Sequence, residues 1–410
     1  MSPVASPDVV LRPAEVELHR RLHPTVAGLP KRILSLDGGG VRGLLTLGIL
    51  HHVESSLAKV KCPDKPEAFR LCEYFDLIGG TSTGSIIAAL LAQGKRVEEI
   101  ESLYLRLAKA IFPKTIRTGF RIAKYDKKSI DQQLNEQFGD VELQSPSFLT
   151  GFALFTKRMD TGKPWVLSNH PGSRFWDQGG NRFYKVRDIV RASTAAPYFF
   201  DPHKFDVQGE NGRVVEHGLF VDGAVGGMNN PSLELLTLAL HKDYPFQWSA
   251  GPEKLFMLSI GTGQWFNQIA IPAYEAKSNV ERAYHAMMGI MQDTALLGLK
   301  HMQALSVPPG MNGAFRSQIN GEIGTMPSFA MTASPLLTFR RLNASLETDQ
   351  LKPIIHNDFR SEAEFTKAVD EIRMIDSAKK ENLDRLYRVG NKAGSFLATE
   401  NVRITLDACP

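Results

Sequence analysis

The chain has 410 residues, of which 43% are hydrophobic and 22% are charged. These proportions are ordinary for a globular protein and exclude a collagen-like, disulfide-framework or wholly disordered chain. The 48 Lys and Arg residues exceed the 44 Asp and Glu residues by only four, a surplus too small to indicate a nucleic-acid partner. The three cysteines (Cys62, Cys72 and Cys409) show no metal-like spacing and favour a reducing compartment.

The N-terminal lead, residues 1–30, contains Pro, Glu and Arg but no continuous apolar stretch of the kind found in a signal peptide. The most apolar windows are Leu44–Leu50 and Ile86–Ala92, and both are too short to cross a bilayer core of roughly 30 Å. We therefore expect a soluble, cytoplasmic protein.

Strands that run into glycine turns and then helices organise the chain. Arg32–Leu36 and Phe75–Ile78 are predicted strands, and the predicted helices Leu44–Leu57 and Ser85–Gln93 follow them. Further strands are expected at Gly151–Lys157, Trp165–Ser168, Gly218–Asp222 and Lys254–Ile260, and further helices at Val97–Ile111, Arg187–Ala196, Glu281–Leu305, Glu362–Ile375 and Lys379–Arg388. Pro308–Pro335 is predicted to lack regular secondary structure. This pattern predicts an α/β fold with a C-terminal extension.

Gly80-Thr81-Ser82-Thr83-Gly84 is a G-x-S-x-G sequence between the apolar strand and the helix of the second unit. Such a turn places the central serine under backbone strain and exposes its hydroxyl at a helix N-terminus. Ser82 is therefore a candidate nucleophile, flanked by the elbow glycines Gly80 and Gly84.

Asp37-Gly38-Gly39-Gly40-Val41-Arg42-Gly43 follows the first predicted strand and also matches the G-x-G-x-x-G dinucleotide pattern. That pattern requires an acidic residue at a strand end about twenty residues onward. Asp64 and Glu67 lie near this distance, but in a polar loop with no preceding strand. The glycines instead favour a cradle of backbone N–H groups for a negative oxygen.

Asp222 ends the predicted strand Gly218–Asp222 and precedes Gly223. An Asp at the carboxyl end of a strand in an open α/β sheet lies on the side where such sheets place their sites, although turn-initiating Asp-Gly pairs are common. The glycine cradle, Ser82 and Asp222 each occur where a strand runs into a loop.

Together, DGGGVRG, GTSTG and DGA resemble the motifs of the patatin-like phospholipases, a family of lipid acyl hydrolases. Segments around Tyr125-Asp126, Phe138–Asp140, Arg191–Phe199 and Ser259–Gly263 are also similar to segments that recur in patatin domains. The resemblance covers roughly residues 31–263. It implies a three-layer α/β/α fold with a mainly parallel central sheet, followed by a helical extension over residues 264–410.

The resemblance also implies the chemistry. Ser82 would be the nucleophile and Asp222 the general base of a Ser–Asp dyad. Backbone amides of Gly38, Gly39 and Gly40, with Arg42 nearby, would form the oxyanion hole. Membrane phospholipid would be the substrate, and neither a metal nor an organic cofactor is expected.

Two alternatives stay open. A Ser–Asp–His esterase would use a histidine after Asp222, and by order alone the candidates are His241, His285, His301 and His356. A non-catalytic binding protein on a hydrolase fold is the second alternative, although Ser82, Asp222 and the glycines are all intact.

Lys114–Lys128 carries six cations against Asp126 alone, with Ile116, Phe120 and Ile122 among them. Such a segment is typical of a solvated face, but it also suggests peripheral docking on the anionic headgroups of the inner membrane. In the extension, Ile319–Gly324 and Arg340–Asn343 resemble the C-terminal part of bacterial patatin-like effectors, some of which respond to cyclic nucleotides in anti-phage signalling. This resemblance suggests a lid relieved by a cyclic dinucleotide or by homo-oligomer formation, or simply a helical cap.

Overall fold

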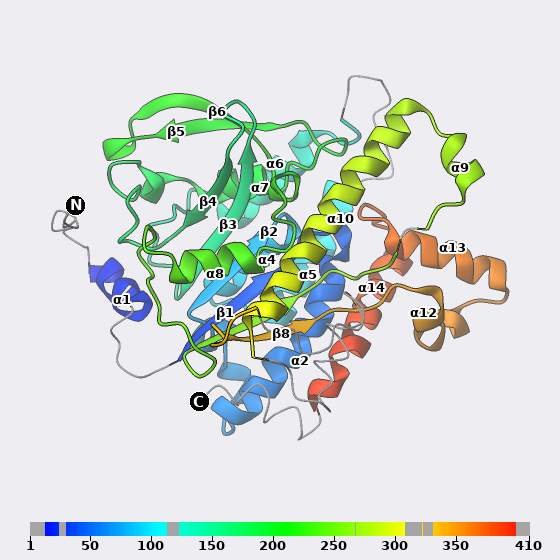
Figure 1. Cartoon of the computed structure of the whole chain (residues 1–410), viewed down its shortest axis with the longest axis horizontal. Helices are drawn as coiled ribbons and strands as arrows, with labels where there is room; N and C mark the ends of the chain where they lie inside the picture. Colours follow the sequence, from blue (N-terminus) through cyan, green and yellow to red (C-terminus); the bar gives the residue numbers. More distant parts are fainter. Residues whose placement is uncertain are drawn as a thin grey trace.

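A largely parallel β-sheet runs through the centre of the protein (Figure 1). The computed structural model describes residues 13–23, 30–112, 123–266, 268–307, 322 and 331–398, and the structural statements below refer to these residues. The strand order is β5-β6-β3-β2-β1-β7-β8, and β4 pairs with β3 outside this path. The strands are β1 (Lys31–Leu36), β2 (Leu77–Thr81), β3 (Gly151–Arg158), β4 (Pro164–Ser168), β5 (His203–Gln208), β6 (Val214–Asp222), β7 (Leu255–Ile260) and β8 (Thr338–Leu342).

The parallel part consists of β3, β2, β1, β7 and β8, whereas β4, β5 and β6 are paired antiparallel. The central strands are apolar runs because helices cover both faces of the sheet. Leu34 and its register partner Ile78 face one core cluster, and the preceding pair, Ile33 and Leu77, faces the other. This alternation builds the three-layer α/β/α arrangement that the family resemblance implies.

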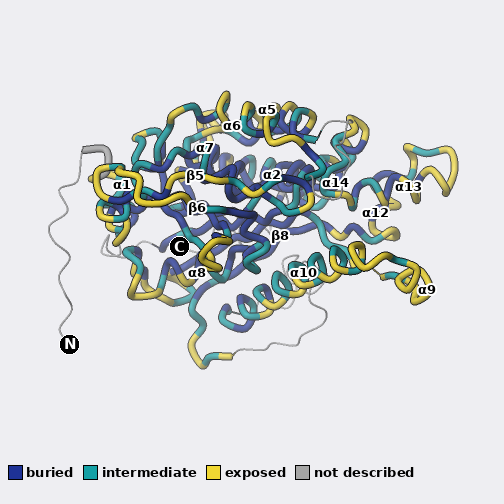
Figure 2. Tube along the Cα trace, turned by 90° about the horizontal axis from the view of Figure 1, so that it is seen from above, coloured by how far each residue is buried: buried dark blue, intermediate teal, exposed yellow. Residues whose placement is uncertain are grey.

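Helices on one side of the sheet supply most of the larger core, and α8 and α10 supply the smaller one. Figure 2 shows the buried residues concentrated between these layers. The helices are α1 (Pro13–Leu22), α2 (Gly43–Lys61), α3 (Leu71–Tyr74), α4 (Thr83–Ala92), α5 (Val97–Ile111), α6 (Lys127–Phe138), α7 (Val186–Ser193), α8 (Ser232–Leu240), α9 (Ile271–Glu275), α10 (Asn279–Leu305), α12 (Thr348–Ile355), α13 (Glu362–Arg373) and α14 (Lys380–Gly394). No described helix is both long enough and apolar enough to cross a bilayer.

The C-terminal extension is mainly helical, as expected, but it also completes the sheet. β8 pairs in parallel with β7, from Thr338 opposite Phe256 to Leu342 opposite Ile260. The sheet therefore continues beyond residue 263, where the sequence suggests the limit of the core. β8 went unpredicted because its sequence, TFRRL, contains two arginines and looks too polar for an interior strand.

The register of the parallel strands determines where the site lies. Leu36, the last residue of β1, lies opposite Gly80 of β2 and Ile260 of β7. The carboxyl ends of these three strands therefore meet at one edge, where the glycine loop after β1 and Ser82 after β2 come together.

Candidate active site

Ser82 lies in the sharp turn between β2 and α4 and has the left-handed backbone angle φ of 53°. A serine in this region is strained, so its surroundings must hold it there. The hydroxyl of Ser193 accepts a hydrogen bond from the Ser82 N–H at 2.9 Å and itself donates to the Phe155 carbonyl at 2.7 Å. Gly80 and Gly84 fit the predicted elbow, because a Cβ at Gly80 would collide with the Gly84 carbonyl.

Asp222 ends β6 and is only 2% exposed. Its carboxylate accepts a hydrogen bond from the Ala224 N–H at 2.9 Å. Burial raises the pKa of Asp222 to about 6, while hydrogen bonding from the Ser82 hydroxyl and the Ala224 N–H opposes this rise. A carboxylate with this pKa is charged at neutral pH and is a much better proton acceptor than an exposed Asp.

The glycine loop is held through its peptide groups. The Gly38 N–H donates to the Asn229 carbonyl at 3.0 Å, and the Thr262 hydroxyl donates to the Gly38 carbonyl at 2.8 Å. The Tyr104 hydroxyl donates to the Gly40 carbonyl at 2.5 Å. Within the described part of the chain, the N–H groups of Gly39 and Gly40 have no acceptor. The Gly38 N–H is occupied, so among the described residues only Gly39 and Gly40 of the three predicted oxyanion donors have an unused N–H.

Arg42 follows the loop and is 8% exposed. Its guanidinium carbon lies 4.8 Å from the centre of the Trp265 ring. Burial lowers the pKa of Arg42 to about 10, with the Asp37 charge opposing, so the group stays protonated at neutral pH. Among the described residues, its Nε and Nη1 atoms have no hydrogen-bond partner. A buried cation with unused donors is suited to an anionic group of a ligand.

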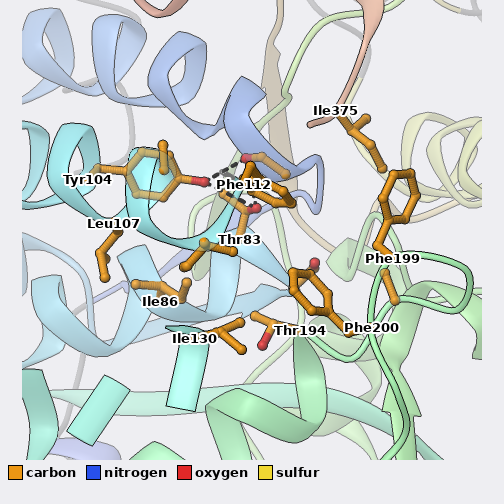
Figure 3. A pocket seen from close by; sticks show the side chains of 15 residues that line it. Thr83, Ile86, Tyr104, Leu107, Phe112, Ile130, Thr194, Phe199, Phe200 and Ile375 are labelled. Atoms are coloured by element: carbon orange, nitrogen blue, oxygen red, sulfur yellow. Dashed lines mark hydrogen bonds between the residues drawn. The ribbon is translucent and has the colours of Figure 1, made fainter. Parts of the chain in front are cut away.

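These groups line a single cleft of about 560 Å³. Helix α10, which runs diagonally across the front of the sheet in Figure 1, contributes Tyr284, Met288 and Met291 to the wall of this cleft. A second, narrow pocket opens beside Ser82 and is lined mainly by apolar side chains, with the polar side chains of Thr83, Tyr104 and Thr194 also in its wall (Figure 3). Its wall includes Ile86, Leu107, Ala108, Ile111, Phe112, Ile130, Phe199, Phe200 and Ile375. The site therefore combines a large cleft with a smaller, mainly apolar pocket beside Ser82.

Of the four histidines that a triad could use, only His285 lies in the lining of the described cleft. His285 is on α10, whereas the described contacts of the Asp222 carboxylate are with Ser82 and Ala224. His241 lies near Asp243, and His356 pairs with Glu362. Among the described residues, no group of three or more His, Cys, Asp or Glu side chains is arranged to hold a metal ion.

Much of the predicted basic segment falls outside the described residues, including Lys114, Arg117 and Arg121. Lys124 is described, and its amine forms an ion pair with Asp376 at 2.5 Å. Of the segment Ile319–Gly324, only Glu322 is described, and it pairs with Arg341. Arg341 also pairs with Asp37, the residue before Gly38.

Sequence reasoning missed the residues that hold the loop and the elbow in place, namely Ser193, Tyr104, Thr262 and Arg341. Ser193 and Thr262 lie within segments that resemble patatin domains, so a signal existed for them. Tyr104 lies inside an ordinary amphipathic helix. Nothing in its local sequence marks a contact with Gly40.

Comparison with known proteins identifies the family. Residues 34–236 match the model of the patatin-like phospholipases. Patatin-16 of Solanum tuberosum is 34% identical over 245 residues, which cover 56% of this chain and 60% of the relative. Patatin-17 of Solanum cardiophyllum is 33% identical over 246 residues, with the same shares. The match thus spans about 60% of the length of these relatives.

Among solved structures, human GIVD cytosolic phospholipase A2 in complex with methyl gamma-linolenyl fluorophosphonate aligns with a TM-score of 0.44 and 12% identity. That alignment covers 97% of this chain and 64% of the other, but it is too distant to add to the assignment. The matched region contains the glycine loop, Ser82 and Asp222. Residues 34–236 are therefore a patatin-like phospholipase domain.

Proposed function

We propose that the protein is a lipid acyl hydrolase of the phospholipase A type, in which Ser82 and Asp222 form the catalytic dyad. The observation that carries this proposal is the contact of a strained, cleft-facing serine with a buried carboxylate whose pKa is about 6. The two amide donors of Gly39 and Gly40 lie in the same cleft. Together these groups supply a nucleophile, a base and an oxyanion site.

In the first half of the reaction, Asp222 accepts the proton of Ser82 while the serine Oγ attacks the acyl carbonyl carbon. The carbonyl oxygen becomes an oxyanion, which the N–H groups of Gly39 and Gly40 stabilise. When this intermediate collapses, the glycerol oxygen leaves and takes the proton from Asp222. A water molecule then attacks the acyl-enzyme while Asp222 accepts its proton, and Asp222 returns this proton to Ser82 Oγ as the acyl–Oγ bond breaks and the fatty acid leaves.

The surroundings of the dyad favour a phospholipid. The apolar pocket beside Ser82 suits a fatty acyl chain, and the unused donors of buried Arg42 suit the phosphate of the headgroup. Large apolar side chains are exposed near the cleft and on α9 and α10: Phe266, Ile271, Tyr274, Val280, Ile290, Leu297 and Met374. We propose that the enzyme acts peripherally at a membrane surface, which agrees with this distribution.

Hydrolysis of phospholipid vesicles by purified protein tests the proposal. We expect release of free fatty acid and lysophospholipid by wild type, and none by Ser82→Ala or Asp222→Asn. His285→Ala should stay active, since loss of activity in this variant would favour the Ser–Asp–His alternative. Equal rates for wild type and Ser82→Ala would instead favour a non-catalytic binding protein.

Activation by a cyclic dinucleotide, a role in anti-phage defence and homo-oligomer formation remain predictions from the sequence resemblance. The same vesicle assay with and without a cyclic dinucleotide tests the first of these. The mass of the protein in solution at assay concentration tests the last.

A further inference from the structure

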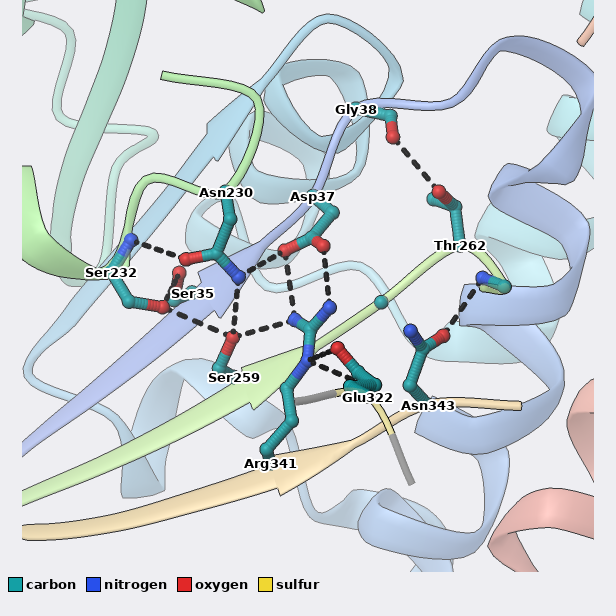
Figure 4. Close-up of polar contacts among 12 residues, drawn as sticks. Ser35, Asp37, Gly38, Asn230, Ser232, Ser259, Thr262, Glu322, Arg341 and Asn343 are labelled. Atoms are coloured by element: carbon teal, nitrogen blue, oxygen red, sulfur yellow. Dashed lines mark hydrogen bonds and ion pairs between the residues drawn. The ribbon is translucent and has the colours of Figure 1, made fainter. Parts of the chain in front are cut away.

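A buried ion pair joins the C-terminal extension to the start of the glycine loop (Figure 4). Asp37 follows β1 and directly precedes Gly38, whereas Arg341 lies 304 residues later on β8. The Arg341 Nη1 donates to Asp37 Oδ1 at 2.9 Å, and Nη2 donates to Oδ2 at 2.6 Å. The contact is therefore bidentate, which fixes the orientation of the carboxylate as well as its position.

The residues that contact this ion pair are also buried, and each forms a hydrogen bond with it. Arg341 donates through Nε to Glu322 at 3.1 Å and through Nη1 to the Ser259 hydroxyl at 2.8 Å. Asn230 donates to Asp37 Oδ1 at 2.9 Å. Asp37 and Glu322 raise the pKa of Arg341 above its usual value, although burial acts in the opposite direction. The guanidinium is therefore a permanent charge between two carboxylates.

The position of Asp37 matters because the oxyanion donors come from the next residues. The direction in which the chain leaves β1 therefore sets where the N–H groups of Gly39 and Gly40, two residues that line the cleft, can point. Asp37 is fixed on one side by its N–H, which donates to Ile260 at 3.1 Å, and on the other by its side chain on Arg341. Catalysis by an oxyanion site depends on donors that are already oriented, and small displacements cost on the order of 100-fold in rate.

We propose that Arg341 is a positioning residue for the glycine loop, so that β8 of the C-terminal extension is part of the catalytic apparatus. This inference rests on the proposed hydrolase function. Arg341 acts through Asp37 and makes no contact with the reacting atoms. It also gives Glu322 and Arg341, which the sequence suggested as part of a regulatory segment, a role in building the oxyanion site.

Arg341→Lys tests the proposal, because it keeps the charge and removes the bidentate geometry. Arg340→Lys is the matched control: it makes the same change at the neighbouring buried position of β8, whose guanidinium donates to the Phe339 carbonyl. For Arg341→Lys we expect kcat to fall about 100-fold with KM nearly unchanged, and phosphonylation of Ser82 by a fluorophosphonate to slow in parallel. Arg340→Lys should keep both rates within about threefold of wild type. The pH at half-maximal kcat should not move in either variant, since Asp222 is untouched.

If Arg341→Lys does not fold, Asp37→Asn replaces it, because this variant keeps the size of the side chain and removes the charge that Arg341 holds. A purely structural role would lower the melting temperature of the Arg340 and Arg341 variants alike and leave kcat per folded molecule unchanged. That result, or equal loss of kcat in both variants, would overturn the proposal. Failure of the hydrolase function is a separate outcome, in which wild type and Ser82→Ala are equally inactive.

Discussion

The carbonyl oxygen of Ile375 accepts a hydrogen bond from the backbone N–H of Val41 at 2.8 Å. Val41 belongs to the glycine-rich turn, whereas Ile375 lies in the segment between α13 and α14. The next residue, Asp376, pairs with Lys124 at 2.5 Å and accepts a hydrogen bond from the Tyr125 hydroxyl at 2.7 Å. One short segment of the extension thus contacts both the turn beside the proposed oxyanion donors and the C-terminal part of the basic segment.

Replacement of Asp376 by Ala tests whether this segment stabilises the site. The change leaves the Lys124 amine and the Tyr125 hydroxyl without their carboxylate, which costs about 1–3 kcal/mol when such groups are partly buried. We expect a lower urea midpoint with an unchanged slope, and a severalfold lower kcat because the Val41 turn loses support. Asp384→Ala on α14 is the control, since that residue is exposed. Equal midpoints for the two variants would contradict the prediction.

The elements that carry Ser82 and Asp222 could be predicted from sequence because their signals are local. The strand and helix around Ser82 are short apolar runs separated by glycines, and the structure places β2 and α4 within a few residues of the expected bounds. The same holds for the strand that ends at Asp222. Local patterns are enough when a turn, a strand end and a helix start are consecutive in the chain.

The supports of the site could not be predicted in this way, because they depend on contacts between distant segments. The local sequence around Arg341 gives no sign of its contact with Asp37, which lies 304 residues earlier in the chain. The role of α10 is hidden for a similar reason. Its methionines fit any amphipathic helix, and only the fold shows that Met288 and Met291 face the cleft. The occupied N–H of Gly38 likewise depends on Asn229, from another loop.

The pH dependence of hydrolysis should follow Asp222. The reaction needs its carboxylate unprotonated, and the pKa of this group is about 6. We expect kcat/KM to fall about tenfold per pH unit well below pH 6 and to level off above it. Because a histidine would give a similar curve, the profile is also measured for His285→Ala. If the fall in kcat/KM near pH 6 is absent from His285→Ala, the titration belongs to the histidine.

The charged carboxylate of Asp222 should lower the free energy of unfolding at neutral pH, where the proposed reaction needs this form. Its pKa is about 6 in the folded protein and 3.8 as the reference value, so the folded state binds the proton more tightly. The free energy of unfolding therefore falls as the pH rises from about 4 to 6, by about 3 kcal/mol in total. Asp222→Asn removes this penalty. We expect the variant to be inactive and more stable by about 2–3 kcal/mol at pH 7.5, with roughly half of that gain at pH 5, as measured by urea unfolding.

Arg42→Met separates two roles for the buried cation. If Arg42 binds the headgroup phosphate, KM for a phospholipid should rise about tenfold or more, since hydrogen bonds to charged groups contribute about 1.5–3 kcal/mol. Hydrolysis of a neutral ester should then change little. If Arg42 instead contacts the oxyanion, kcat should fall for both substrates. Arg106→Met on α5 is the control, because this arginine is exposed.

Chain-length preference should depend on the apolar pocket beside Ser82. Ala108 lies in its wall on α5 and is buried, so Ala108→Leu adds three carbons to the pocket lining. Each methylene of the substrate that no longer fits loses about 0.8 kcal/mol of burial, roughly fourfold in binding. We expect kcat/KM for long acyl chains to fall about 10- to 100-fold relative to short chains. Ala110→Leu makes the same change on the same helix outside the pocket, and its preference should match wild type. A uniform loss for all chain lengths in Ala108→Leu would mean that the acyl chain binds elsewhere, and the cleft under α10 would then be the place to substitute next.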